Sequence, residues 1–296
     1  MARLAGLIGN RSDIAGRILS AEAEILRVRR DAPVSSSRGP ASAHANGNGP
    51  LGWGIGFWQG GEVLIRRRPS DESDVIDLGK LAADVRGDAV LCHVRSATDG
   101  DLRTENTHPF RYREWLFGQT GTVSGFLDHD ELRARMLASV PDFLRSGIRG
   151  ETDAEIVFHV FLSFLHDAGK LQGAATAEDV AEALRSSLAV IDGMSAEVGG
   201  APAPLNVLVG NGELFVAACR RSELAYRVYA GKEDAEALLG DDQALRRRTP
   251  DLERLHAVLV ASDFDGGVVP GGRWKRVEKH AMVTLRRDVD PKVAPL

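Results

Sequence analysis

The sequence predicts an α+β fold in which helices cover layered strands. Segments with the apolar patterns of strands lie toward both ends of the chain, and two strongly amphipathic helical segments lie in the middle. This order lacks the regular alternation of strand and helix that a doubly wound parallel sheet requires. Neither an internal repeat nor a linker-like stretch divides the 296 residues, so we expect a single domain over residues 1–296.

The first elements are a strand, a helical segment and a long loop. Residues 3–8 are apolar and β-like, and a Gly-Asn turn signal follows them. Apolar residues then recur at helical spacing over residues 14–28. Residues 32–50 are rich in Ser, Pro, Ala, Gly and Asn without apolar periodicity, which predicts a flexible surface loop.

A hairpin, a helix and a buried strand complete the first third of the chain. Residues 53–58 and 63–68 read as two strands joined by a Gly-Gly turn. Residues 74–86 are expected to be helical, and the apolar run 89–94 is expected to be a buried strand.

The second half begins with the amphipathic helices. Thr152 and Glu155 have the spacing of a capping box ahead of an apolar helix over residues 156–165. Thr176 is a suitable N-cap for a second helix that runs to residue 191. The strands expected after it span residues 205–209, 214–219, 225–229, 256–261 and 281–285.

Composition narrows the class of protein. The chain has 37 Lys plus Arg against 42 Asp plus Glu and a net charge of −5, which argues against a nucleic-acid partner. Two cysteines exclude a disulfide scaffold and a four-thiolate zinc site, and we expect no metal or other cofactor. No apolar run approaches about 18 residues and no signal peptide is visible, so we expect a cytoplasmic protein that does not bind membranes.

Polar residues with chemical potential concentrate between residues 92 and 126. Arg95 ends an apolar strand, where it suits either a carboxylate ligand or a structural ion pair. His108 precedes Pro109 and is expected in an extended or turn segment, where a lone histidine is more often structural. Asp153 favours a helix N-terminus whatever the function. The run Arg66-Arg67-Arg68 is interpreted as solvated surface.

Taken together, three motifs resemble one family. They are His-Val-Arg-x-Ala-Thr at residues 93–98, Asn-Thr-His-Pro-Phe at 106–110, and Gly-x-Thr-Asp-x-Glu at 150–155. This order resembles the class II glutamine amidotransferases, and Gly-Trp-Gly-Ile-Gly-Phe at 52–57 is similar to another block of that family. The resemblance is strongest to its small stand-alone group, which includes γ-glutamyl hydrolases. It implies the N-terminal nucleophile (Ntn) hydrolase fold, a four-layer αββα sandwich with two antiparallel sheets.

The resemblance also assigns roles to residues. By motif position, Arg95 holds the α-carboxylate of the substrate and Asp153 its α-ammonium, while the backbone of Gly121 belongs to the oxyanion hole. Thr98 and His108 fall in the loops that wall the glutamine pocket. The implied ligand is glutamine or a γ-glutamyl compound. We expect Arg95 to lie near Asp153 with Gly121 facing the gap, unless the two side chains simply pair.

Two departures affect the catalytic groups. Ala2 stands where the family has its nucleophilic cysteine, and Thr120 replaces the Asn of the oxyanion hole. Leu51 stands where close relatives often have Asp, and neither Cys92 nor Cys219 is placed to substitute for the nucleophile. We therefore favour an inactive pseudoenzyme that retains a glutamine or γ-glutamyl-type pocket, and we expect a protein partner whose identity the sequence does not reveal. The alternatives are an active amidotransferase or γ-glutamyl hydrolase with an engineered Cys-to-Ala change, and a structural or interaction subunit with a vestigial pocket.

Overall fold

A seven-stranded antiparallel sheet contains the N-terminal strand near its centre. The computed structural model describes residues 2–29, 51–96, 101–172, 174–241, 247 and 251–296. The strand order of this first sheet is β13-β11-β12-β1-β6-β3-β4, and every neighbouring pair is antiparallel. Its strands are β1 (Arg3–Gly9), β3 (Leu51–Gln59), β4 (Glu62–Asp71), β6 (Ala89–Ser96), β11 (Leu224–Ala230), β12 (His256–Ser262) and β13 (Trp274–Val277).

A second antiparallel sheet packs on the first, with the strand order β15-β14-β10-β9-β8-β7. Its strands are β7 (Phe110–Tyr112), β8 (Trp115–Thr120), β9 (Asn206–Gly210), β10 (Leu214–Cys219), β14 (Ala281–Arg286) and β15 (Val289–Pro295). A small separate ribbon pairs β2 (Arg27–Arg29) with β5 (Val75–Asp77).

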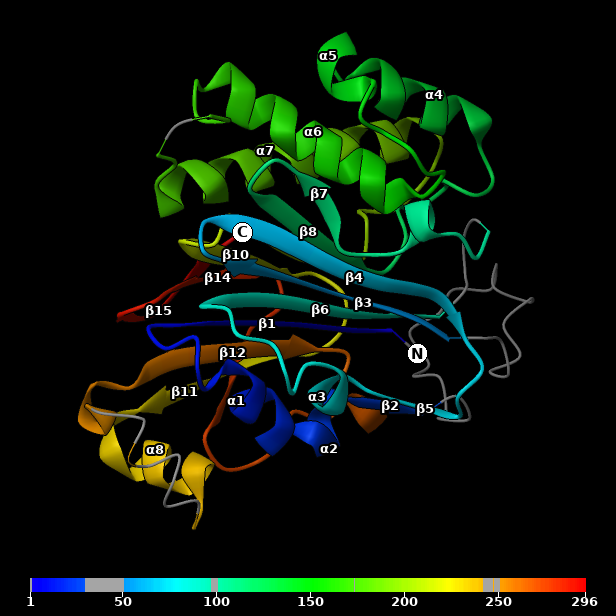
Figure 1. Cartoon of the computed structure of the whole chain (residues 1–296). Coiled ribbons are helices and arrows are strands. Elements are labelled where there is room, and N and C mark those ends of the chain that lie inside the picture. The colour runs from blue at the N-terminus through cyan, green and yellow to red at the C-terminus, as the bar shows by residue number, and fades with distance from the viewer. Residues whose placement is uncertain (1, 30–50, 97–100, 173, 242–246, 248–250) are drawn as a thin grey trace.

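Helices cover the outer face of each sheet, so the four layers follow the order αββα (Figure 1). The first sheet is covered by α1 (Ala15–Ala21), α2 (Ala23–Leu26), α3 (Leu78–Leu81) and α8 (Gly231–Leu239). The second is covered by α4 (Asp130–Ala138), α5 (Asp142–Arg145), α6 (Asp153–Asp167) and α7 (Ala177–Glu197). This confirms the predicted four-layer sandwich with two antiparallel sheets.

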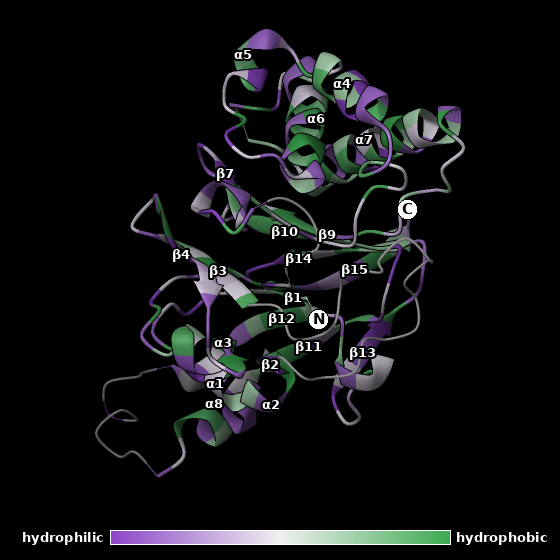
Figure 2. Ribbon diagram, turned by 90° about the vertical axis from the view of Figure 1, so that its right-hand side faces the viewer, coloured by the Kyte–Doolittle hydropathy of each residue, from purple (hydrophilic) through white to green (hydrophobic). Residues whose placement is uncertain are grey.

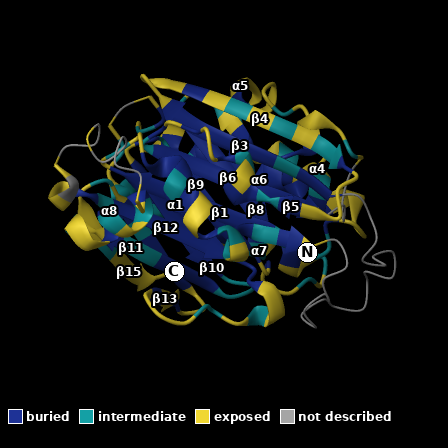
Figure 3. Ribbon diagram, turned by 60° about the horizontal axis from the view of Figure 1, so that its bottom comes forward, coloured by how far each residue is buried: buried dark blue, intermediate teal, exposed yellow. Residues whose placement is uncertain are grey.

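Three hydrophobic cores follow from the four layers. One lies between the sheets and contains Leu4, Leu91 and Leu208, and the other two lie between each sheet and its helices. All seven residues of β1 are buried because both of its faces are covered. The hydropathy colouring in Figure 2 and the burial colouring in Figure 3 show the same division, with buried apolar strands inside and exposed polar residues toward the turns.

Several local predictions need correction. Residues 74–86 do not form one helix: they begin with β5 and continue into the single turn of α3, because Ile76 packs into the core beside β2 and Asp77 caps Lys80 N–H. The segment 14–28 also does not form one helix: it divides into α1, α2 and β2, and Val28 of β2 pairs with Ile76 of β5. The predicted loop 32–50 lies outside the described residues.

The helix caps are confirmed in part. Thr152 accepts from Glu155 N–H as expected of an N-cap, but the Glu155 carboxylate accepts from the backbone N–H groups of Arg149 and Gly150. The capping box at this helix is therefore half formed. The complete box lies at Thr176 and Asp179, at the start of α7.

Glycines on β3 allow a polar segment to lie directly against the first sheet. A Cβ on Gly54 would stand 1.9 Å from the carbonyl oxygen of His108, and one on Gly56 would stand 2.9 Å from Cγ of Pro109. These distances are too short for a real Cβ, so the segment around His108 lies where only glycine leaves room. The Gly-x-Gly-x-Gly pattern of the sequence thus has a packing explanation.

We expect Gly54→Ala to lower the free energy of unfolding by ~1–3 kcal/mol, because the added methyl group must displace the backbone of His108. Chemical denaturation measures the change. Gly193→Ala is the matched control: it lies within helix α7 with no atom within 4 Å of the added Cβ, so it should stabilise the protein slightly. Equal stability of the two variants would contradict the packing argument.

Candidate functional site

The start of β1 brings Ala2 to the space between the two sheets. Leu4 pairs with His93 and Arg3 pairs with Val94 in the antiparallel register of β1 and β6, so one further residue on each chain segment places Ala2 opposite Arg95. Leu4 belongs to the core between the sheets, and side chains alternate along a strand, so residues 2, 93 and 95 share that inner face. Ala2 is half-buried and brings only a methyl group to it.

Arg95 is buried and holds the backbone of a neighbouring segment. Its Nη1 donates to the carbonyl oxygens of Asn106, at 2.8 Å, and Asp101, at 3.3 Å. The side chain of Asn106 adds a second tie, donating from Nδ2 to Asp101 O and accepting from the N–H of Glu151. The guanidinium therefore stabilises the segment 101–106, whatever else it binds.

Asp153 begins helix α6 and is also buried. Its Oδ2 accepts from Nε2 of Gln119 at 3.0 Å and from the backbone N–H of Val123 at 2.7 Å. A carboxylate in the first helical turn complements the exposed amides there. Asp153 therefore anchors the helix to the end of β8, and its expected proximity to Arg95 across Gly121 stays a prediction.

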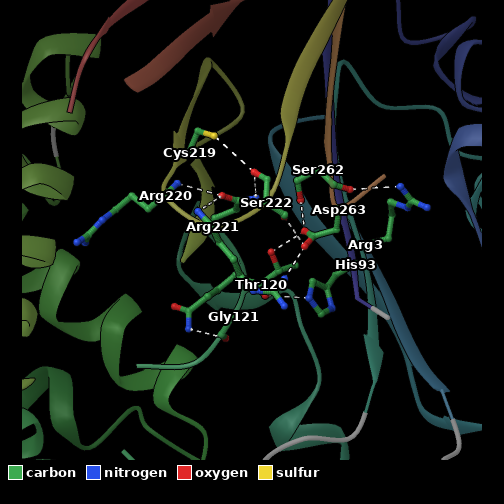
Figure 4. A network of polar contacts seen from close by, with 12 residues as sticks. Arg3, His93, Thr120, Gly121, Cys219, Arg220, Arg221, Ser222, Ser262 and Asp263 are labelled. Atoms are coloured by element: carbon green, nitrogen blue, oxygen red, sulfur yellow. Dashed lines mark hydrogen bonds and ion pairs between the residues drawn. The ribbon is translucent and has the colours of Figure 1, made fainter. Parts of the chain in front are cut away.

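The end of β8 meets a carboxylate that the sequence analysis did not single out. Figure 4 shows Asp263, directly after β12, at the centre of a polar network. Its Oδ2 accepts from the hydroxyls of Thr120 at 2.6 Å and Ser262 at 2.5 Å. Its Oδ1 accepts from Ser222 Oγ at 2.5 Å and Arg221 Nη1 at 2.6 Å. Four donors thus surround one buried carboxylate, and the hydroxyl proton of Thr120 is directed to it.

Gly121 is required by geometry. Its φ is +94°, in the region that favours glycine, and a Cβ there would stand 2.1 Å from the carbonyl oxygen of Pro204. The same Cβ would stand 2.8 Å from Cδ of Arg221, a member of the Asp263 network. The turn after Thr120 therefore packs tightly against the segment before β9 and against the β10–β11 connection.

Two buried histidines pack together beside this turn. The ring centroids of His93 and His108 are 4.1 Å apart, and Nε2 of His93 donates to the carbonyl oxygen of Gln119. Burial lowers the pKa of His93 to about 4 and holds the pKa of His108 well below its ordinary value. Both rings are therefore neutral near pH 7.

The other residues named from the sequence are Thr98, the two cysteines and Leu51. Thr98 lies outside the described residues. Both cysteines are buried, and burial raises the pKa of Cys92 to about 12 and of Cys219 to about 11, so neither is a reactive thiolate at neutral pH. Leu51 pairs across the strands with Asp71, whose carboxylate accepts from the indole N–H of Trp53.

The interpretation of Arg66-Arg67-Arg68 as solvated surface is wrong for its middle member. Arg67 is half-buried and donates to the carbonyl oxygens of Thr104 and Pro109. Arg66 and Arg68 are exposed. Alternation along β4 explains the difference, because the middle residue faces the opposite side of the sheet from its neighbours.

The comparisons with known proteins agree with the sequence motifs. A family model described as "Glutamine amidotransferases class-II" matches residues 32–292. The chain belongs to this family. Glutamine–fructose-6-phosphate aminotransferase (isomerizing) of Lactococcus lactis is 27% identical over 236 residues, which is 72% of this chain and 33% of that protein. Escherichia coli YafJ, whose own assignment as a glutamine amidotransferase is provisional, is 29% identical over 120 residues, or 38% of this chain.

The chain spans only about half the length, or less, of these curated relatives. The match covers 42% of YafJ and 51% of a Haemophilus influenzae protein with the same provisional assignment as a glutamine amidotransferase. Solved structures support the fold over the whole chain. A glutamine aminotransferase class-II domain protein from Silicibacter pomeroyi matches with a TM-score of 0.54 at 18% identity, covering 99% of this chain and 98% of that one. Glutamine phosphoribosylpyrophosphate amidotransferase of Bacillus subtilis matches with a TM-score of 0.52 at 15% identity, over 99% of this chain and 49% of that one.

Within the described residues, no group of three or more His, Cys, Asp or Glu side chains is arranged to hold a metal ion. None of the helices described is both long and apolar enough to cross a lipid bilayer.

We expect acid to destabilise the fold through its buried histidines. In the unfolded chain His93 binds a proton near pH 6.5, whereas in the folded chain it does so only near pH 4. The unfolded chain therefore binds more protons between these values, so the free energy of unfolding falls as pH drops through this window. His108 acts in the same direction. The check is the pH dependence of the free energy of unfolding between pH 6.5 and 5.

His93→Gln should reduce the slope of stability against pH by up to ~1.4 kcal/mol per pH unit. His166→Gln is the control, because that side chain is 47% exposed. Identical slopes in the wild type and in His93→Gln would contradict the assignment of a neutral buried imidazole.

Proposed function

We propose that this protein is a class II glutamine amidotransferase-like pseudoenzyme, which binds glutamine or a γ-glutamyl compound without cleaving it. The observation that carries the proposal is the hydrogen bond from Thr120 to Asp263, and it is joined by a half-buried Ala2 whose side chain has no nucleophilic atom. The site then acts as a ligand sensor toward an unidentified protein partner in the cytoplasm.

The chemistry of amide cleavage explains why these groups matter. The family's reaction forms an acyl-enzyme on a cysteine thiolate, and a methyl group cannot attack a carbonyl carbon. The tetrahedral intermediate also needs hydrogen-bond donors aimed at its oxyanion. The Thr120 hydroxyl donates to a carboxylate, so the side chain that replaces the family's Asn has no free proton for that task. Of the donors in the proposed oxyanion hole, only the backbone N–H of Gly121 would remain.

The residues that the family resemblance assigns to ligand binding, by contrast, are retained in the sequence. We assign the α-carboxylate of the ligand to Arg95, whose planar guanidinium suits a carboxylate, and the α-ammonium to Asp153. His108 and Thr98 are assigned to the pocket wall, as the family resemblance implies. Both His108 nitrogens are buried and lack a hydrogen-bond partner among the described residues.

Two other functions remain as alternatives. An active amidotransferase or γ-glutamyl hydrolase with an engineered Cys-to-Ala change would explain Ala2, but it would not explain Thr120. A structural or interaction subunit with a vestigial pocket is favoured by one observation: Arg95 already binds the carbonyl oxygens of Asp101 and Asn106. The two experiments below separate these functions from the proposed one.

The first experiment measures glutaminase activity as glutamate release. We expect no activity from the wild type and little from Ala2→Cys, because loss of one oxyanion donor typically reduces the rate by ~10²–10³. Ala2→Cys/Thr120→Asn should be clearly more active than Ala2→Cys. Mass spectrometry confirms in each case that Met1 is removed, so that residue 2 has a free amine. Strong activity of Ala2→Cys alone would instead identify an active enzyme whose cysteine had been replaced.

The second experiment titrates glutamine calorimetrically. Arg95→Ala should remove most of the affinity, by a few kcal/mol for a desolvated charged contact. Arg68→Ala is the control: this exposed arginine pairs with Asp71, on the opposite face of the sheet from Arg67. Saturable binding that survives Arg95→Ala would refute the carboxylate assignment. A lower melting temperature, with no binding in either form, would favour the vestigial subunit.

A further inference from the structure

Arg67 has no role in the motifs or in the proposed function, yet the structure places it against the backbone of the segment that carries His108. Arg67 pairs across the strands with Gly54, Gly54 pairs with His93, and His93 pairs with Leu4. Directly opposed residues in neighbouring strands present their side chains on the same face. The four residues therefore form one row on the inner face of the first sheet, with Arg67 and His93 on either side of the glycine.

The segment 104–109 lies across this row. The carbonyl oxygen of His108 lies over Gly54, where a Cβ would be 1.9 Å away, and the His108 ring packs on His93. Arg67 holds the segment at both ends: Nη1 donates to Thr104 O at 3.4 Å and Nη2 donates to Pro109 O. One side chain thus connects the two residues that bracket Asn106, Thr107 and His108.

Arg95 holds the preceding part of the same loop from the other side of β3. It donates to the carbonyl oxygens of Asp101 and Asn106, so two guanidiniums on strands β4 and β6 together bind carbonyls from residue 101 to residue 109. A guanidinium has five N–H donors in a rigid fork, which suits this bridging of separate carbonyls. Charge-assisted hydrogen bonds of this kind are stronger than neutral ones.

Arg67 makes these contacts in a partly buried environment. Arg67 is half-buried, burial lowers its pKa below the ordinary arginine value, and its Nε is buried without a partner among the described residues. An arginine on a solvated surface would show none of these features. The two neighbours of Arg67 in the sequence are exposed, and their side chains contact Leu81 O and Asp71 on the other face.

We propose that Arg67 is a positioning residue of the pocket. It fixes the segment 104–109 on the glycine row of β3, and so sets the position of His108 and of the carbonyl oxygen of Asn106 against which Arg95 is aligned. The inference rests on the proposed function for the identity of the ligand, but its effect on the segment is independent of any ligand. Arg67 acts through the segment and does not itself touch the ligand.

The test compares Arg67→Ala with Arg68→Ala, the adjacent arginine on the opposite face. Amide hydrogen exchange, read by mass spectrometry, reports the segment directly. Arg67→Ala should increase exchange at least 10-fold in peptides that cover residues 103–108, and leave peptides from α6 and β12 unchanged. Arg68→Ala should leave all of them unchanged. Unchanged exchange in Arg67→Ala, or an increase spread evenly over the whole chain, would overturn the proposal.

Glutamine titration of the same variants supplies the second readout. Arg67→Ala should weaken binding at least 10-fold at a temperature well below its melting temperature, and Arg67→Lys should recover part of the loss because an ammonium still donates to one carbonyl. If Arg67→Ala fails to fold, Arg67→Met keeps the apolar stem and removes the donors, and the same comparisons apply. Wild-type affinity in a variant whose segment exchanges freely would overturn the positioning role. Absence of glutamine binding in every form, wild type included, would refute the proposed function, while the exchange pattern would still decide the role of Arg67.

Discussion

The hydrogen bonds that converge on the Asp263 carboxylate hold together the strand ends around the candidate site. They join the end of β8 through Thr120, the end of β12 through Ser262, and the β10–β11 connection through Arg221 and Ser222. These segments belong to both sheets, so one buried charge links the two inner layers where the hydrophobic core ends. A buried carboxylate is stable only when donors surround it, and here both oxygens are fully occupied.

The same network determines what the site can do chemically. A hydroxyl has one proton, and Thr120 gives it to Asp263. The Asn that the family has at this position carries two donors on one nitrogen, so it can bind an acceptor of the protein and still donate to an oxyanion. Under the proposed function, Thr120 would therefore leave no side-chain donor for an oxyanion, while it keeps a donor for Asp263.

Patterns of apolar residues predicted most of the fold correctly, because periodicity reports burial. The strands around Leu4, Leu91 and Val258 were predictable because both faces are covered and the runs are continuously apolar. Strand β8 was not predicted, although it is fully buried, because Gly118, Gln119 and Thr120 interrupt its apolar pattern. Gln119 and Thr120 donate to Asp153 and Asp263, residues 34 and 143 positions away in the sequence, and no local pattern can reveal such partners.

The sequence likewise predicted some residues of the candidate site and missed others. Arg95, His108, Gly121 and Asp153 were singled out by their motifs, and the structure buries each of the three with polar side chains. Asp263 and Arg67 were missed. The signal for Asp263 was a Ser-Asp pair at the end of an apolar strand, and for Arg67 it was the alternation of strand β4, which places the middle arginine of three on the inner face. Both signals become specific only when the register between strands is known.

The pattern of retained and lost residues follows from what the fold itself demands. Gly121 has a positive φ and no room for a Cβ, Arg95 binds two backbone carbonyls, and Asp153 anchors the start of a helix. Each would be needed by the fold even without a reaction, so their presence alone does not indicate catalysis. Ala2 is half-buried at the free end of a strand, where a cysteine would contribute little to stability. Under the proposed function, position 2 is therefore one whose side chain would serve the reaction and contribute little to the fold, so its replacement would leave the fold intact.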